Sequence, residues 1–218
     1  MSIREDIATY QPYNEQEQVD KQVMLSCLDR DPNCFERGSL AHFATSIWTV
    51  DPTLTRTLLE YHNIYQSWSW IGGHADGERD LAAVALRELA EETGVTRACL
   101  VPCGIYSLEV CTVDGHEKRN AYVGSHLHLN VTYLAIADPD QPLAGKPDEV
   151  NGVRWAPLED AVALSTEPWF RERIYRKLID KLADVDPAQV AQAVEQVRAM
   201  QARRGDGARR GAGPRSGL

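Results

Sequence analysis

The sequence predicts an α/β fold, an α/β/α sandwich with a mixed β-sheet. Several segments rich in β-branched and aromatic residues read as strands. One strongly helical segment begins after Asp80, a good N-cap, and ends at Gly94, which suits the residue that follows a helix. The elements follow the order strands, helix, long strands, short strand, helix. This order is typical of helices packed on both faces of a sheet.

The chain of 218 residues is long enough to bury one sizeable core with some length to spare. We expect four parts: an N-terminal helical extension at residues 1–39, the main domain at 40–165, C-terminal helices packed on it at 166–204, and a tail at 205–218. The tail is rich in Gly and Arg and has almost nothing to bury, so it is expected to be disordered.

The segment before the central helix begins with a polar stretch and a helix from about Asn14 to Leu28. Residues 41–50 then read as a strand, and after the turn at Asp51-Pro52 residues 55–62 read as its hairpin partner. The extended stretch SWSWIGG leads from this hairpin into the helix.

After the helix, residues 98–113 read as one long strand and 114–122 as a polar loop. The next strand, 125–137, alternates polar and apolar residues, which predicts one polar face. That face is interpreted either as half-exposed or as the lining of a cleft opposite the helix. The chain then continues with a loop at 138–151, a short strand GVRWAPL, a helix LEDAVAL and C-terminal helices broken at Asp186-Pro187.

The composition limits the classes of partner. A net charge of -9 argues against a surface for nucleic-acid duplexes, since such surfaces neutralise phosphates with Lys and Arg. No segment approaches the length of a membrane span, and the N-terminus lacks a basic start followed by an apolar stretch, so we expect a cytoplasmic protein. The five cysteines form no CxxC pairs and are expected to be reduced. A homodimer is left open.

The central helix has an apolar face that turns acidic halfway along. At about 100° per residue, Leu81 and Val84 share their side with Glu88, Glu91 and Glu92. Like charges at these spacings repel, and ionised carboxylates leave water at low cost only when they are paired or bound to metal. Clustered carboxylate oxygens suit Mg²⁺ or Mn²⁺, so the pattern predicts a divalent-metal site.

The stretch from Gly73 to Val95 resembles the signature of the Nudix hydrolase family. That signature is a glycine, five residues, a glutamate, seven residues, then Arg-Glu, an aliphatic residue, any residue, Glu-Glu, any residue, Gly and an aliphatic residue. The residues that match it in register are Gly73, Arg87, Glu88, Leu89, Glu91, Glu92, Gly94 and Val95.

One position departs from the signature. Arg79 stands where the family has its first glutamate, which in the family braces the loop and the arginine. Arg87 therefore needs another anionic partner, and Asp76, Glu78 and Asp80 are the local candidates. Because Asp80 is expected to cap the helix, Glu78 is the first choice.

The resemblance implies the Nudix fold and hydrolysis of a nucleoside diphosphate linked to another moiety, by water activated by Mg²⁺ or by Mn²⁺. It assigns Glu88, Glu91 and Glu92 to the metal, the Gly73 carbonyl as a further ligand, and Arg87 to bracing the loop. The family often has one more glutamate in a later loop, and Glu149 is the nearest match.

Substrate binding is predicted at His126 and His128, two neighbours on the polar strand face, and at Trp70, which could stack on a base. The alternative for Trp70 is packing in the core or at its rim.

Two other functions stay open at this point. The Nudix fold also hosts an isopentenyl diphosphate isomerase, which uses a cysteine and a glutamate. The domain could also be a nucleotide sensor without activity, since fold alone does not determine function.

Overall fold

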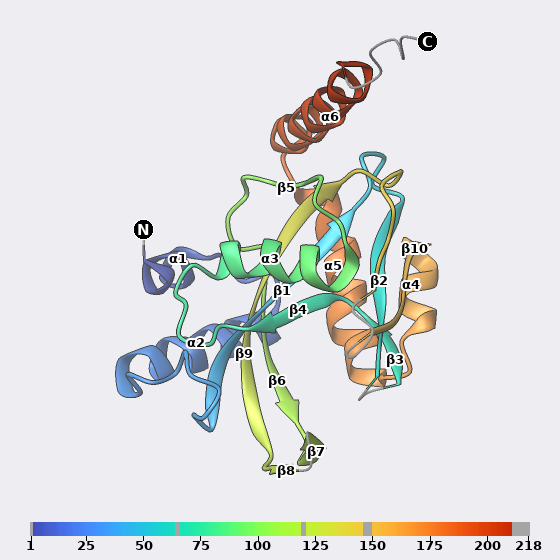
Figure 1. Ribbon diagram of the computed structural model, residues 1–218. Helices are drawn as coiled ribbons and strands as arrows, with labels where there is room; N and C mark the ends of the chain where they lie inside the picture. Colours follow the sequence, from blue (N-terminus) through green and yellow to red (C-terminus); the bar gives the residue numbers. More distant parts are fainter. Residues whose placement is uncertain (1, 64–65, 119–120, 146–149, 211–218) are drawn as a thin grey trace, which may run out of the picture.

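A mixed sheet of eight strands forms the centre of the molecule (Figure 1). The computed structural model describes residues 2–63, 66–118, 121–145 and 150–210. Five strands follow the order β10-β2-β1-β9-β5, while β3 attaches to β2, β4 to β1 and β6 to β9. Among the described residues of this sheet, β1 and β9 pair in parallel and the other pairs are antiparallel. The strands are β1 (Ala41–Val50), β2 (Arg56–His62), β3 (Ser67–Ser69), β4 (Ile71–His74), β5 (Ala98–Leu100), β6 (Ser107–Val113), β9 (His126–Ala137) and β10 (Val150–Pro157).

Helices pack on both faces of this sheet, which confirms the predicted sandwich. Phe43 on one face packs with Leu89 of α3. Trp48 on the other face stacks on Tyr175, in a cluster that also includes residues of α4, α5 and α6. The helices are α1 (Ile3–Thr9), α2 (Glu15–Arg30), α3 (Leu81–Thr93), α4 (Leu158–Leu164), the π-helix η1 (Phe170–Tyr175), α5 (Arg176–Lys181), the 3₁₀ turn η2 (Leu182–Asp184) and α6 (Pro187–Arg210).

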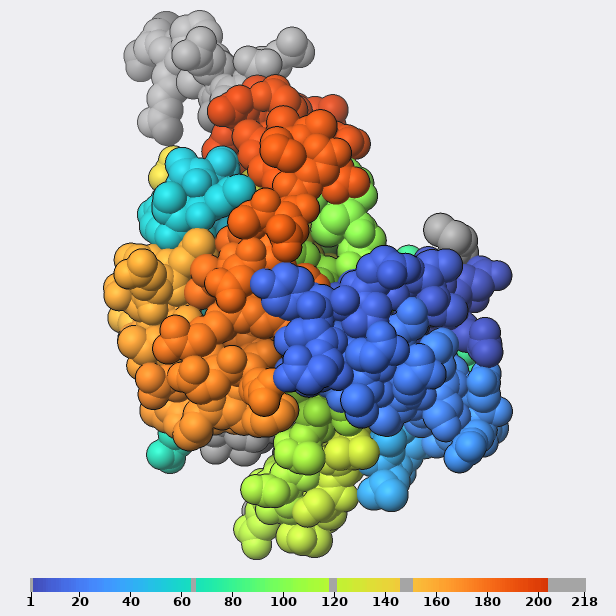
Figure 2. Space-filling model, turned by 180° about the vertical axis from the view of Figure 1, so that it is seen from behind, coloured from blue at the N-terminus to red at the C-terminus, as the bar shows by residue number. Residues whose placement is uncertain are grey.

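The N-terminal helices lie beside the segment formed by η1 and α5, although the two segments are far apart in the sequence. Figure 2 shows them next to each other when the molecule is seen from behind. Arg173 of η1 contacts Glu15 at 2.7 Å, and Lys181 of α5 contacts the buried Glu17 at 3.2 Å. The N-terminal extension is therefore part of the folded core.

Helix α1 was not expected, because the first residues read as a polar stretch. It begins after Ser2, which forms a capping box with Glu5, and buries Ile3 and Ile7. The S-x-x-E pattern that starts this helix is visible in the sequence.

The prediction of one long strand at residues 98–113 is wrong. The structure has two strands, β5 and β6, separated by a turn that contains Pro102 and Gly104, the latter at φ +74°. Proline cannot donate to a sheet ladder, and a positive φ favours glycine. Both strands pair with β9, β5 near Ala137 and β6 near His126.

The polar face of β9 is more deeply buried than a half-exposed strand would be. Asn130 and Thr132 are buried, and both are hydrogen-bonded to Glu109 of β6. The half-exposed alternative is therefore wrong for this part of the strand.

Two further differences lie at the periphery. The predicted loop at 114–122 contains a small hairpin of β7 (His116–Lys118) and β8 (Ala121–Val123). Helix α6 continues to Arg210, past the predicted start of the tail, and residues 211–218 lie outside the described residues. None of the helices in the described part of the chain combines the length and apolarity that crossing a bilayer requires.

Candidate active site

The glycines that precede α3 lie in β4, which pairs with β1. A Cβ atom on Gly73 would lie 2.5 Å from Cδ and 2.7 Å from Oε1 of Glu88, so no larger residue fits without a shift. The main chain of Gly73 and the carboxylate of Glu88 are therefore in direct contact. This is the proximity that the two predicted metal ligands require.

The three glutamates of α3 differ in exposure. Glu92 is buried at 6% exposure, Glu88 is half-buried and Glu91 is exposed. The helix packs on the sheet through residues that include Leu81 and Leu89. The apolar face thus continues into carboxylates within one helix, as the sequence pattern predicts.

Arg87 donates to Glu78 at 2.7 Å, which confirms the predicted partner. This hydrogen bond raises the pKa of the Arg87 guanidinium above its ordinary value. Asp80 caps the helix by accepting from the amide of Ala83 at 3.0 Å. Glu78 thus takes the place of the displaced signature glutamate as the partner of Arg87.

The segment before β1 holds the loop between β4 and α3, a contact that the sequence analysis missed. Arg37 forms a bidentate ion pair with Asp76, and the amide of Gly77 donates to the carbonyl of Phe35 at 3.0 Å. The Arg79 guanidinium lies 4.5 Å from the centre of the Phe35 ring. The arginine at the departing signature position therefore stacks on an aromatic ring.

His126 and His128 lie on β9 and face the side of the sheet opposite α3. Their neighbours are His42 of β1 and His74 of β4, which the sequence analysis did not single out. The alternation along β1 could have indicated His42, because Phe43 next to it points into the core beneath α3. Substrate binding by His126 and His128 stays a prediction.

Trp70 is 9% exposed and belongs to an aromatic cluster. Its ring makes edge contacts with Phe170 and Tyr175 at centroid distances of 6.0 and 5.9 Å. Its amide donates to the Tyr175 hydroxyl at 3.2 Å. These contacts favour the packing interpretation, while stacking on a base stays a prediction. Glu149 lies outside the described residues, so its predicted contribution also stays a prediction.

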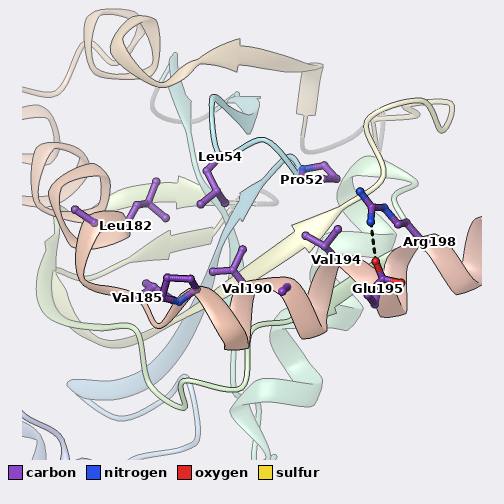
Figure 3. A pocket seen from close by; sticks show the side chains of 11 residues that line it. Pro52, Leu54, Leu182, Val185, Val190, Val194, Glu195 and Arg198 are labelled. Carbon is purple, nitrogen blue, oxygen red and sulfur yellow. Dashed lines mark hydrogen bonds and ion pairs between the residues drawn. The ribbon is translucent and has the colours of Figure 1, made fainter.

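A cavity of about 430 Å³ opens between the β1–β2 turn and α6 (Figure 3). Its polar side chains include Glu195 and Arg198, which contact each other at 2.6 Å. No residue of α3 or β4 is among the described residues that line it. The cavity is therefore separate from the carboxylate site. Its lining consists of Pro52, Leu54, Leu182, Ala183, Val185, Pro187, Val190, Ala191, Val194, Glu195 and Arg198.

Several solved structures are similar to this chain at low sequence identity. A NUDIX-family hydrolase from Clostridium perfringens is 20% identical and superposes with a TM-score of 0.45, covering 65% of this chain and 97% of that one. An Ap4A hydrolase from C. elegans is 21% identical with a TM-score of 0.46, covering 66% and 98%. A dihydroneopterin triphosphate pyrophosphohydrolase from E. coli is 14% identical with a TM-score of 0.49, covering 64% and 95%.

No curated protein matches the chain. The comparison with family models gives a more direct result. The model of the NUDIX domain matches residues 44–178, which is more than half of the sequence and includes β4, its loop and α3. The chain therefore belongs to the Nudix family, whose hydrolases act on phosphoric anhydrides.

Proposed function

We propose that this protein hydrolyses the pyrophosphate bond of a nucleoside diphosphate linked to another moiety, with Mg²⁺ or Mn²⁺ as cofactor. The observation that carries the proposal is the contact between Gly73 and Glu88. It brings the main chain of β4 against a helix face that presents further carboxylates.

The residues present fit a hard divalent cation. The space that a Cβ at position 73 would fill is occupied by a carboxylate, and Glu88 and Glu92 project from α3 four residues apart, on one face. Glu88, Glu91 and Glu92 would hold the cation, together with the carbonyl of Gly73. A bound cation supplies neutralisation of phosphate charge and a lowered pKa of coordinated water.

The other residues of the site position this loop. Arg87 ties the helix to Glu78 on the loop, and Asp76 ties the loop to Arg37 of the N-terminal segment. Phosphoryl transfer needs charge neutralisation and alignment of the nucleophile more than covalent participation of the protein, so a fixed loop beside the carboxylates suits it.

The experiment is a panel of nucleoside diphosphate derivatives incubated with Mg²⁺, with the phosphate-containing products separated. We expect hydrolysis that excess EDTA abolishes. Glu92→Gln and Glu88→Gln should each lower turnover by at least about 100-fold, because each removes a negative oxygen ligand. Thermal melting of both variants should stay close to wild type, since removing one of three like charges relieves repulsion.

Glu195→Gln is the matched control, because this glutamate is exposed, pairs with Arg198 on α6 and lies outside the carboxylate site. Its turnover should equal that of the wild type. Full activity in EDTA, or in either Glu88→Gln or Glu92→Gln, would exclude the metal assignment.

The isomerase alternative requires a reactive cysteine, which the structure disfavours. Burial raises the pKa of all five thiols, to about 11 at Cys34. A thiol with a raised pKa is a poor nucleophile or acid–base group near neutral pH.

A further inference from the structure

Four of the six histidines of the chain gather at one end of the sheet. They are His42 of β1, His74 of β4, and His126 and His128 of β9. One ring nitrogen from each lies within 4.8 Å of those of the other three. His42 is buried and the other three are half-buried, so the group is close to solvent on one side.

Strand pairing brings these residues together. His42 pairs with His128 in the parallel register of β1 and β9, and Ala44, two positions along β1, pairs with His74. Neighbouring residues in a strand point to opposite faces. Because Gly73 faces Glu88 of α3, His74 faces the other side of the sheet. The histidines and the carboxylates therefore lie on opposite sides of β4.

Hydrogen bonds to main-chain carbonyls orient two of the rings. Nδ1 of His42 donates to the carbonyl of Ser39 at 2.9 Å, and Nδ1 of His126 donates to that of Gly124 at 2.8 Å. A ring that donates through Nδ1 in its neutral form presents a lone pair at Nε2. Such bonds from the second ring nitrogen are the usual support of metal-binding histidines.

Two of the ring nitrogens lie close together inside the group. Nε2 of His126 lies 3.1 Å from Nε2 of His128. Nε2 of His42 is buried and has no hydrogen-bond partner among the residues that the structure describes. A buried polar atom in this state needs a ligand or an ordered water to satisfy it.

The electrostatics agree with neutral rings. Burial holds the pKa of His42 below its ordinary value, with His126 among the further causes. Burial, followed by His74, His42 and His126, lowers the pKa of His128 to about 2. Metal ligands must be deprotonated at the coordinating nitrogen, so neutral imidazoles are the competent form.

We propose that His42, His74, His126 and His128 form a second metal site, for a divalent transition-metal ion with Zn²⁺ as the best fit. Imidazole nitrogen suits Zn²⁺, whereas Mg²⁺ requires oxygen ligands. Zn–N bonds of about 2.0 Å place tetrahedral ligands about 3.3 Å apart, close to the 3.1 Å between His126 and His128. The nitrogens of the group lie within 4.8 Å of one another and would reach that geometry by small rotations of the side chains.

The role of this site is structural. Four protein ligands close a tetrahedral zinc site, whereas catalytic zinc keeps one position open. The ion would tie together β1, β4 and β9, three strands that are far apart in the sequence. It would also fix His74, the residue next to Gly73, and so hold strand β4, after which the loop to α3 begins.

The test is metal binding by the full-length protein after removal of metals with a chelator. Co²⁺, a spectroscopic substitute for Zn²⁺, should bind with one equivalent and give the visible absorption of a tetrahedral nitrogen site. Zn²⁺ should displace it, and millimolar Mg²⁺ should not. Zn²⁺ should also raise the melting temperature, because a ligand that binds only the folded state stabilises it.

Variants locate the site. His42→Ala and His128→Ala should weaken Zn²⁺ binding by at least about 100-fold and abolish the Co²⁺ absorption. His126→Gln, at a half-buried position, is the second variant in case either alanine variant fails to fold by circular dichroism. His116→Ala is the matched control, because this ring lies beside His126, at 6.3 Å between centroids, but outside the group of four.

Three results would overturn the proposal. One is a folded His126→Gln or His128→Ala that binds Co²⁺ and Zn²⁺ as the wild type does. Another is binding that persists in these variants but is lost in Glu92→Gln, which would move the ion to the carboxylates. Binding lost equally in His116→Ala would likewise contradict the assignment.

Discussion

The two halves of the polar face of β9 differ in how their polar atoms are satisfied. Asn130 and Thr132 are buried in a network with Glu109. His126 and His128, on the same face nearer the strand start, contact other histidines, and His126 also donates to the carbonyl of Gly124. One half combines donors with carboxylate acceptors, and the other brings imidazole rings together.

The half with Asn130 and Thr132 continues into a buried group of charges. Glu109 accepts from Lys177 at 2.9 Å, and the same lysine lies 3.1 Å from Glu17. Lys181 contacts Glu17 as well. Two carboxylates and two ammonium groups compensate one another, so this network needs no ligand and serves the fold.

The two proposed metal sites have one property in common. Each gathers one kind of polar group, imidazole rings in one case and carboxylates on α3 in the other, and such a set would be satisfied by a cation. A balanced set of donors and acceptors needs none.

The largest effect on stability is expected for Lys177→Met. It leaves Glu109 and Glu17 buried beside one lysine instead of two, and breaking a buried ion pair costs about 3–5 kcal/mol. Urea unfolding at neutral pH measures the change. Arg176→Ala is the control on the same helix, because its pair with Glu172 is exposed and contributes about 0–1 kcal/mol. Equal losses of unfolding free energy in the two variants would show that the buried network stabilises the fold no more than an exposed ion pair does.

Acid should weaken the same network. Burial opposes ionisation of Glu17, but Lys177 and Lys181 outweigh it and lower its pKa to about 2 from 4.5. A carboxyl with a depressed pKa stabilises the fold above its unfolded pKa, and this stabilisation is lost as the pH falls from about 4.5 to 2. The loss should be on the order of 2–3 kcal/mol. Urea unfolding across this range measures it.

Glu17→Gln is the matched variant for the acid experiment. It should unfold more easily at neutral pH, and its stability should depend less on pH below 4.5. A slope as steep as that of the wild type would assign the acid sensitivity to other groups.

A smaller effect is expected for Thr132→Val, which removes the hydroxyl that donates to Glu109 at 2.9 Å. Losing a buried hydrogen bond to a charged group costs about 1.5–3 kcal/mol. His126→Gln in metal-free protein should change stability by only about 0.5 kcal/mol, as for a substitution outside the core. A larger loss of stability in His126→Gln than in Thr132→Val would show that the histidine half, and not the half with Asn130 and Thr132, contributes more to the stability of the fold.

The smallest effect on stability is expected for Glu78→Gln. The pair with Arg87 is about two-fifths exposed on both sides, so it contributes about 0–1 kcal/mol. Turnover should fall moderately and clearly less than in Glu92→Gln, because the loop is loosened while the carboxylates of α3 remain. Asp80→Asn keeps a good cap and should be nearly silent. If Asp80→Asn lost most of its turnover while Glu78→Gln kept it, Asp80 rather than Glu78 would brace the loop.

Local sequence patterns determined the parts of this protein that depend on near neighbours. The cap at Asp80, the end of α3 at Gly94 and the turn of its apolar face into carboxylates are set within one helix, so helical periodicity predicts them. The β-branched and aromatic residues of 41–50 likewise predict strand β1 from a local signal. The pairing of Arg87 with Glu78 could be predicted because the two residues are only nine positions apart. The other candidate, Asp80, is occupied by capping the helix.

Only the tertiary structure decided which distant segments meet. The gathering of His42 with His128 depends on β1 and β9 pairing in parallel, and the charge network depends on α2 meeting α5. Alternation says which face a side chain takes, but it carries no information on which strand lies next to it. The break between β5 and β6 has a local cause in Pro102 and Gly104, whereas the pairing of both strands with β9 is a property of the sheet.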